Sequence, residues 1–210
     1  IPLIKIYMKF KSTLFLLIFI ILVQGCESKE TISDETFTKE KETVKKEVKA
    51  NTKDDADKIV FNLKTYDDKK FNITINNQKW NFEGYENKVI LLDFFATWCP
   101  PCKRSIPHLN TIRTQFKDKV EILGLDIGNR DGTINSKEKL AKFIKDYNIK
   151  YPVTRGNVNN QIFSGLSSLN PMGSIPFMIL FNQDGQFVKP YVGMVPEQQL
   201  HNDISSLLKK

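Results

Sequence analysis

The sequence predicts an α/β domain in which helices flank a central mixed β-sheet. Segments typical of strands alternate with amphipathic helical segments, and a strand pair around a tight turn precedes the last helix. The run Val89–Phe95 is apolar except for Asp93, which is typical of a central strand buried on both faces. The chain of 210 residues is long enough for one such domain and additional segments.

The N-terminal part has the pattern of a targeting signal. A basic stretch from Met8 to Lys11 precedes an unbroken apolar run from Leu14 to Val23. These are the two leading regions of a secretory signal, and the run is short for a permanent membrane helix, which needs about 20 residues. We expect residues 1–25 to be this signal, with the natural start at Met8.

The signal ends in Val23-Gln24-Gly25-Cys26, which resembles the bacterial lipobox. The resemblance implies that Cys26 is diacylated and becomes the first residue. The alternative is an uncleaved membrane anchor with an incidental cysteine. Both place the rest of the chain in an oxidising compartment outside the cytoplasm. We therefore expect a bacterial cell-envelope protein, lipid-anchored, with its folded domain in the periplasm or extracytoplasmic space.

Residues 26–58 carry many Lys, Glu, Asp and Thr residues and few large apolar ones. Such a segment cannot bury enough surface to offset its ordering entropy, so we interpret it as a charged flexible tether. The folded domain then covers residues 59–210. The formal net charge is +7, but the Lys residues are interleaved with acidic ones and no motif of a nucleic-acid reader is present. We expect no nucleic-acid partner and a monomer.

The first half of the domain is predicted from apolar runs and turn residues. Two short strands flank a turn at Asp67-Asp68 and form an N-terminal β-hairpin. The buried central strand follows, and then a helix whose apolar residues recur at helical spacing. The expected ranges are Ile59–Lys64, Phe71–Ile75, Lys88–Phe95 and Cys99 to about Phe116.

The second half continues the alternation. A strand precedes an amphipathic helix and a further short strand. Asn182-Gln183-Asp184-Gly185 is a hairpin turn between two strands, and the closing helix has a proline near its start. The expected ranges are Val120–Asp126, Lys137–Tyr147, Tyr151–Thr154, Phe177–Phe181, Gln186–Val192 and Pro196–Leu208.

The run Trp98-Cys99-Pro100-Pro101-Cys102 is the candidate redox site. A thiol at a helix start lies at the positive end of the helix dipole, beside free N–H groups, which stabilises the thiolate and lowers its pKa. We expect Cys99 to be the exposed nucleophile and Cys102 the shielded, resolving thiol. The exchange proceeds through a mixed disulfide and needs no cofactor.

Two other interpretations of the cysteine pair are weaker. A zinc site needs more ligands, and the chain offers only His108, His201 and Cys26 besides this pair, so we expect no metal. An inert structural disulfide across so short a loop would stabilise little.

The segment Leu92–Lys103 resembles the active-site segment of thioredoxins, and more closely that of the TlpA/ResA-like group of membrane-tethered thioredoxin-fold proteins. Pro107 matches a proline that kinks the active-site helix, Ser174-Ile175-Pro176 the cis-proline loop, and Val192-Gly193 a glycine beside the substrate groove. The similarity covers about residues 59–210. The stretch from Arg130 to Pro171 fits the helix-and-strand unit inserted in that group.

The resemblance implies a thioredoxin-like fold and roles for further residues. Asp93, a buried carboxylate in an apolar strand, matches the position that relays a proton to or from the resolving cysteine. The alternative is an Asp at a strand end facing water. Trp98, Pro100, Ile175, Pro176 and Gly193 are the expected substrate-binding residues. Ser105 stands where the group often has Glu, so any proton transfer by that acid is absent.

We therefore predict a thiol–disulfide oxidoreductase. The resemblance suggests that it reduces protein disulfides, such as apocytochrome c thiols during cytochrome c maturation, with electrons from a membrane donor. A disulfide oxidase remains open because the residues between the cysteines tune the potential. So does a tethered thioredoxin-fold adaptor that binds partners without turnover.

Overall fold

The computed structural model of the protein describes residues 58–209. The predicted signal, Cys26 and nearly all of the tether lie outside these residues. The described part holds two β-sheets, one of three strands in the order β1-β2-β3 and one of five in the order β6-β5-β4-β7-β8. No helix of the described part is long and apolar enough to cross a membrane.

The five-stranded sheet is built around β4 (Val89–Phe95), every residue of which is buried. Strand β4 pairs in parallel with β5 (Val120–Asp126) and antiparallel with β7 (Phe177–Phe181). Short β6 (Val153–Thr154) and β8 (Phe187–Val192) form the two outer strands. The mixed sheet and its buried central strand are confirmed.

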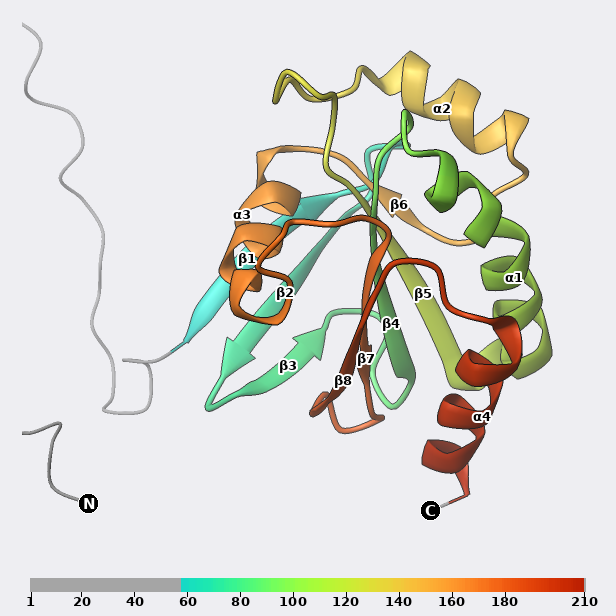
Figure 1. The fold of residues 1–210 in the computed structure, drawn as a ribbon. Coiled ribbons are helices and arrows are strands. Elements are labelled where there is room, and N and C mark those ends of the chain that lie inside the picture. The colour runs from blue at the N-terminus through green and yellow to red at the C-terminus, as the bar shows by residue number, and fades with distance from the viewer. Residues whose placement is uncertain (1–57, 210) are drawn as a thin grey trace, which may run out of the picture. The chain divides into compact units, whose positions relative to one another are not determined.

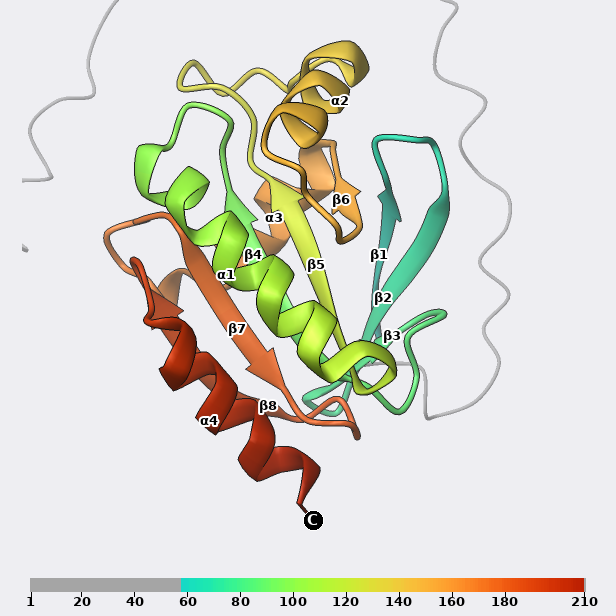
Figure 2. The ribbon, with the colours of Figure 1, turned by 90° about the vertical axis from the view of Figure 1, so that its right-hand side faces the viewer.

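The two faces of this sheet are covered by different elements (Figures 1 and 2). Helices α1 (Pro100–Phe116) and α4 (Glu197–Leu208) pack on one face, and α2 (Lys137–Asp146) lies beside the start of α1. Strands β1–β3 and helix α3 (Asn157–Gly165) cover the other face. Alternate residues of β4 feed the two cores: Leu91 and Phe95 face the α1 side, and Leu92 and Phe94 face the other.

The small sheet consists of β1 (Ile59–Lys64), β2 (Lys70–Asn76) and β3 (Lys79–Phe82). It is joined to the large sheet near both of that sheet's edges. The N–H of Tyr66 donates to the Val153 carbonyl at 3.0 Å, and that of Trp80 to the Gly185 carbonyl at 2.8 Å. A Cβ at Gly185 would lie 1.7 Å from the Trp80 carbonyl oxygen, so this contact requires a glycine.

Most predicted elements are confirmed within a residue or two. The N-terminal hairpin is one strand larger than expected: β3 follows a two-residue turn at Asn77 and Gln78, which both have positive φ. Helix α3 was also not predicted individually. Its sequence starts with Asn residues of low helix propensity, and it is held by the burial of Asn159 and Ile162.

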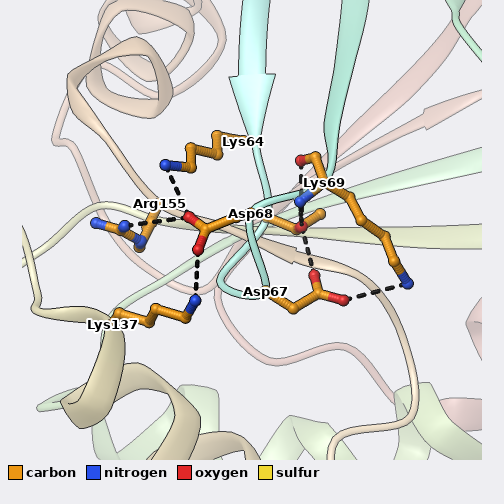
Figure 3. A network of polar contacts seen from close by, with 7 residues as sticks. Lys64, Asp67, Asp68, Lys69, Lys137 and Arg155 are labelled. Carbon is orange, nitrogen blue, oxygen red and sulfur yellow. Dashed lines mark hydrogen bonds and ion pairs between the residues drawn. The ribbon is translucent and has the colours of Figure 1, made fainter.

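A network of charges fixes the β1–β2 turn (Figure 3). Asp68 accepts from Lys64 at 2.7 Å and lies 3.6 Å from Arg155, and it also pairs with Lys137 at the start of α2. Hydrogen bonds from Lys137 and Lys64 hold the pKa of Asp68 well below its usual range. The network joins the hairpin to α2 and to the segment that leads from β6 into α3.

We predict that Asp68→Asn lowers the melting temperature at low salt, and that the loss shrinks in 1 M salt because the pairs are solvent-exposed. The depressed pKa means that Asp68 stabilises the fold above its ordinary pKa and loses this effect as the pH falls through its folded-state pKa. Thermal unfolding at two salt concentrations measures the effect, with exposed Asp184→Asn as the control. An identical loss in the control would contradict this role of the network.

Candidate active site

The sheet topology brings four chain segments to one end of the five-stranded sheet, the end at which β4 and β5 finish. Phe95, the last residue of β4, lies opposite Asp126, the last residue of β5. Phe177 at the start of β7 pairs with Val192 at the end of β8. On its other side, Phe177 pairs with Phe94 near the end of β4. The segments that leave these strand ends all meet at the start of α1, at the upper left in Figure 2. Open α/β sheets commonly bind their ligands at this end, beyond the carboxyl ends of the parallel strands.

Cys99 is the N-cap of α1, with extended backbone at φ −88° and ψ 107°. It forms a disulfide with Cys102, and its Sγ accepts a hydrogen bond from the Cys102 N–H at 3.2 Å. Pro100 and Pro101 occupy the first helical positions, where a missing N–H costs nothing, and the first turn has no acidic residue. The dithiol therefore lies at the positive end of the helix dipole.

The expectation that Cys99 is exposed is not met in this oxidised protein. Cys99 is 2% exposed and Cys102 3%. Both sulfurs are tied into the short ring, and Trp98 and Ile175 pack against the core cluster that contains them. Pro100, in contrast, is exposed beside the disulfide.

The Ile175-Pro176 peptide bond is cis. The Ile175 carbonyl oxygen lies 3.8 Å from the Cys99 Sγ. A disulfide sulfur has no hydrogen to donate, so this is a contact that a protonated thiol could turn into a hydrogen bond. The N–H of Gly193 donates to the Pro176 carbonyl at 2.8 Å, which fixes the end of β8 against the proline loop. The structure thus brings Ile175, Pro176 and Gly193 together on the side of the disulfide where β7 begins and β8 ends.

Trp98 is half-buried beside Cys99. Its indole N–H donates to the Gly128 carbonyl at 2.9 Å, and the Arg130 guanidinium lies 4.1 Å from the ring centroid. A Cβ at Gly128 would lie 2.4 Å from the Thr133 carbonyl oxygen, and its φ is +85°, so the loop that receives the indole requires a glycine.

Sequence reasoning missed the polar anchor of this loop. The Asn135 amide donates to both oxygens of the buried Asp126 carboxylate, at 3.0 and 2.9 Å, and lies 3.4 Å from the Thr97 hydroxyl. The Gly128 N–H donates to the same carboxylate at 3.2 Å. A carboxylate ending an apolar strand is the signal that could have identified Asp126, since Asp93 was noticed for a similar reason.

Asp93 is 3% exposed, and its Oδ1 is buried without a hydrogen-bond partner. Asp93 lies two residues from both Leu91 and Phe95 along β4, so its side chain points to the same face of the sheet as theirs. That face packs on the core that contains both cysteines. Burial raises the pKa of Asp93 to about 7, although a hydrogen bond with Tyr151 lowers it in part. The alternative interpretation, an Asp at a strand end facing water, is wrong.

Tyr151 reaches Asp93 across a glycine. Gly124 of β5 lies opposite Asp93, and a Cβ there would lie 3.1 Å from the Tyr151 ring. Burial and the neighbouring Asp93 raise the pKa of Tyr151 well above its usual value, so the phenol stays protonated and can only donate to the carboxylate. This pair was not foreseen, because Tyr151 is distant from Asp93 in the sequence.

Comparison with known proteins agrees with this geometry. Residues 87–187 match the profile of a family described as thioredoxin-like. The thiol-disulfide oxidoreductase ResA of a Bacillus cereus strain is 27% identical over 134 residues, which cover 63% of this chain and 71% of that protein. ResA of Bacillus subtilis (strain 168) is 27% identical over 135 residues, covering 64% and 69% of the two chains.

Solved structures show the same fold. A thiol:disulfide interchange protein of the thioredoxin family from Chlorobium tepidum TLS has a TM-score of 0.55 at 18% identity, covering 71% of this chain and 93% of that one. The exposed lipoprotein thioredoxin of Streptococcus pneumoniae strain TIGR4 has a TM-score of 0.53 at 20% identity, covering 71% and 100%.

The raised pKa of Asp93 predicts how stability depends on pH. The folded protein keeps a proton that the unfolded chain releases, so stability falls as the pH rises from about 4 to about 7 and is constant above. Asp93→Asn removes this loss. We expect the variant to be more stable than the wild type at pH 8 by about 2–4 kcal/mol, since one pKa unit corresponds to about 1.4 kcal/mol.

Urea unfolding of the oxidised proteins between pH 4 and pH 8 measures this difference, with exposed Asp118→Asn as the matched control. The advantage of Asp93→Asn should vanish toward pH 4. Parallel pH profiles for wild type and Asp93→Asn would show that Asp93 is already ionised at low pH in the folded protein.

Proposed function

Because the chain is a thioredoxin-like thiol–disulfide oxidoreductase related to ResA, we propose that it works as a reductant of protein disulfides in the bacterial cell envelope. The observation that carries this proposal is the Cys99–Cys102 disulfide at the start of α1, above a buried carboxylate on the same face of the sheet. A thiolate at the N-cap is stabilised by the helix dipole and by the Cys102 N–H.

The reaction is a pair of exchanges. The Cys99 thiolate attacks one sulfur of a substrate disulfide, which forms a mixed disulfide and releases the other sulfur as a thiolate. Cys102 then loses its proton and attacks the Cys99 sulfur, which releases the second substrate sulfur and leaves Cys99–Cys102 oxidised. Two electrons pass to the substrate, so a thiol donor in the membrane must reduce the pair again.

We assign to Asp93 the role of accepting the proton that Cys102 loses before it attacks. The pKa of about 7 lets the carboxylate accept a proton near neutral pH, whereas an ordinary Asp would be too weak a base. Burial keeps the pKa of Tyr151 well above its usual value, so the phenol stays protonated and cannot take the proton itself. Ser105 stands near the second cysteine on α1, and its hydroxyl donates to the Pro101 carbonyl at 3.2 Å, so it supplies no carboxylate.

Ile175, Pro176 and Gly193 are the residues that we assign to substrate binding, together with Trp98 and exposed Pro100. The Ile175 backbone lies beside the disulfide and can pair with an extended substrate segment. Apocytochrome c, whose cysteines must be reduced before haem attachment, is the substrate we propose. A membrane-tethered monomer fits such a substrate, with Cys26 as the lipid attachment site that keeps the domain beside its electron donor.

The first test traps the substrate. Cys102→Ser should accumulate mixed disulfides with envelope proteins, because the resolving thiol is missing and release is blocked. Cys99→Ser should trap far fewer, because Cys99, and not Cys102, is the N-cap of α1 whose thiolate the Cys102 N–H and the helix dipole stabilise. Non-reducing electrophoresis after acid quenching measures the adducts and identifies the partners. Equal trapping by both variants would contradict the assigned order of attack.

The second test concerns the anchor. Cells supplied with a radiolabelled fatty acid should label the wild type and not Cys26→Ala, and the variant should be found in the soluble envelope fraction. Cys99→Ala is the matched control, since it removes a cysteine without affecting the proposed lipid site. Label on Cys26→Ala, or none on the wild type, would contradict lipid attachment at Cys26.

A further inference from the structure

We infer that this site prefers protein disulfides in which a cysteine has an acidic side chain on one flank and apolar side chains on the other. The inference rests on the proposed function and specifies its substrate class. It is carried by a cationic rim and an apolar face that lie on different segments around Cys99. The cationic rim consists of Lys103, Arg104, Arg130 and Lys139, and the apolar face of Met172, Val192 and Met194.

Arg130 is the central member of the cationic rim. It is exposed, and its guanidinium lies 4.1 Å from the centroid of Trp98, the residue next to Cys99. Stacking on an indole fixes the plane of a guanidinium while leaving its N–H groups free for a carboxylate. An acidic side chain near the attacked cysteine can therefore reach Arg130 without breaking an existing ion pair.

Hydrogen bonds to a buried carboxylate and within the loop hold the loop that carries Arg130 in place. The Asn135 amide and the Gly128 N–H both donate to buried Asp126, and the Asn129 N–H donates to the Thr133 carbonyl at 2.8 Å. Trp98 is bound to the same loop through the Gly128 carbonyl. The guanidinium is thus positioned before a substrate arrives, which reduces the ordering cost of binding.

The four residues of the cationic rim outnumber the exposed acids beside them, Asp131 and Glu138. Lys103 and Arg104 lie in the first turns of α1, which has no acidic residue in its first turn, and Lys139 hydrogen-bonds Asn129 beside Arg130. Among nearby acids, Asp93 and Asp126 are buried. Exposed Asp131 accepts from the N–H and hydroxyl of Thr133, at 3.0 and 2.6 Å. The surface therefore favours an acidic partner.

The residues of the apolar face come from the two segments that meet on the other side of the disulfide, the proline loop and the end of β8, where the Gly193 N–H donates to the Pro176 carbonyl. Met172 is 88% exposed, Val192 51% and Met194 43%. Met172 lies at the tip of a turn in which the Gly173 N–H donates to the Asn170 carbonyl at 2.9 Å. The Asn170 amide N–H donates to the Ser174 carbonyl, and the Asn170 Oδ1 accepts from the Ser174 N–H. Exposed methionines adapt their shape to apolar partners, so this face suits a range of apolar side chains.

The test uses peptides that carry one cysteine as a mixed disulfide with 5-thio-2-nitrobenzoate, whose release is coloured. Leu residues precede the cysteine, and Glu, Gln or Lys stands two positions after it. We expect the reduced full-length protein to react faster with the Glu peptide than with the Lys peptide by about fivefold at low salt, which corresponds to about 1 kcal/mol for an exposed pair. The ratio should approach one in 1 M salt.

Substitutions locate the preference. Arg130→Gln should bring the Glu-to-Lys ratio close to one, and Arg130→Glu should invert it. Lys79→Gln, which removes an exposed charge from β3 far from this edge, is the control and should keep the wild-type ratio. Met172→Ser with Met194→Ser should slow the Leu peptides and leave a peptide with Ser in place of Leu unaffected.

The outcomes separate the two claims. If no peptide releases the chromophore, the proposed reductase function fails. If all peptides react equally fast with the wild type, the protein is still an oxidoreductase but the inferred substrate class is wrong. A preference that persists in Arg130→Gln, or is lost equally in Lys79→Gln, would assign it to net charge and overturn the role of Arg130.

Discussion

The arrangement of the site depends on the position of β4, which is buried along its length and hydrogen-bonded on both sides. Burying each of its large apolar side chains contributes about 1.5–3 kcal/mol, so the strand cannot shift register without losing both cores at once. Because β4 is fixed, its end is fixed, and Cys99 follows a few residues later at the start of α1. The ends of β5 and β8 and the start of β7 meet the same edge, which supplies Gly128, Gly193 and the Ile175 carbonyl.

The same burial that fixes β4 makes Asp93 costly and chemically useful. A carboxylate in an apolar strand would be strongly disfavoured if it stayed ionised, and the fold relieves this by raising its pKa and by providing the Tyr151 hydroxyl. Gly124 leaves room for the Tyr151 ring beside Asp93, since a Cβ there would lie 3.1 Å from the ring. A few buried residues therefore set the pKa of Asp93, which faces the same core as the dithiol. A separate pair, Asp126 and Asn135, holds the loop that contacts Trp98.

The sequence predicted the class of fold, the order of most elements and the cysteine pair, because these depend on local patterns: apolar runs, turn residues and the spacing of two cysteines. Strand β3 was missed because it has only four residues, and helix α3 because it starts with Asn residues of low helix propensity; the packing of both is decided by the rest of the fold. Tyr151, Asn135 and Arg130 act through contacts with residues distant in the chain, which spacing does not reveal. The burial of Cys99 also could not be foreseen, since it depends on packing by Trp98 and Ile175 from two different segments.

The central claim is that the Cys99–Cys102 pair donates electrons to protein disulfides. Strong oxidants stabilise the attacking thiolate far beyond the effect of a helix start, and the residues between these cysteines are two uncharged prolines. The charge of Arg130 is exposed and stacked on Trp98, so it adds little. The reduction potential of the pair, measured by equilibration in glutathione buffers, tests the claim most directly. A value near the reducing end, toward about −270 mV, is expected, and a value near about −120 mV would identify an oxidase instead.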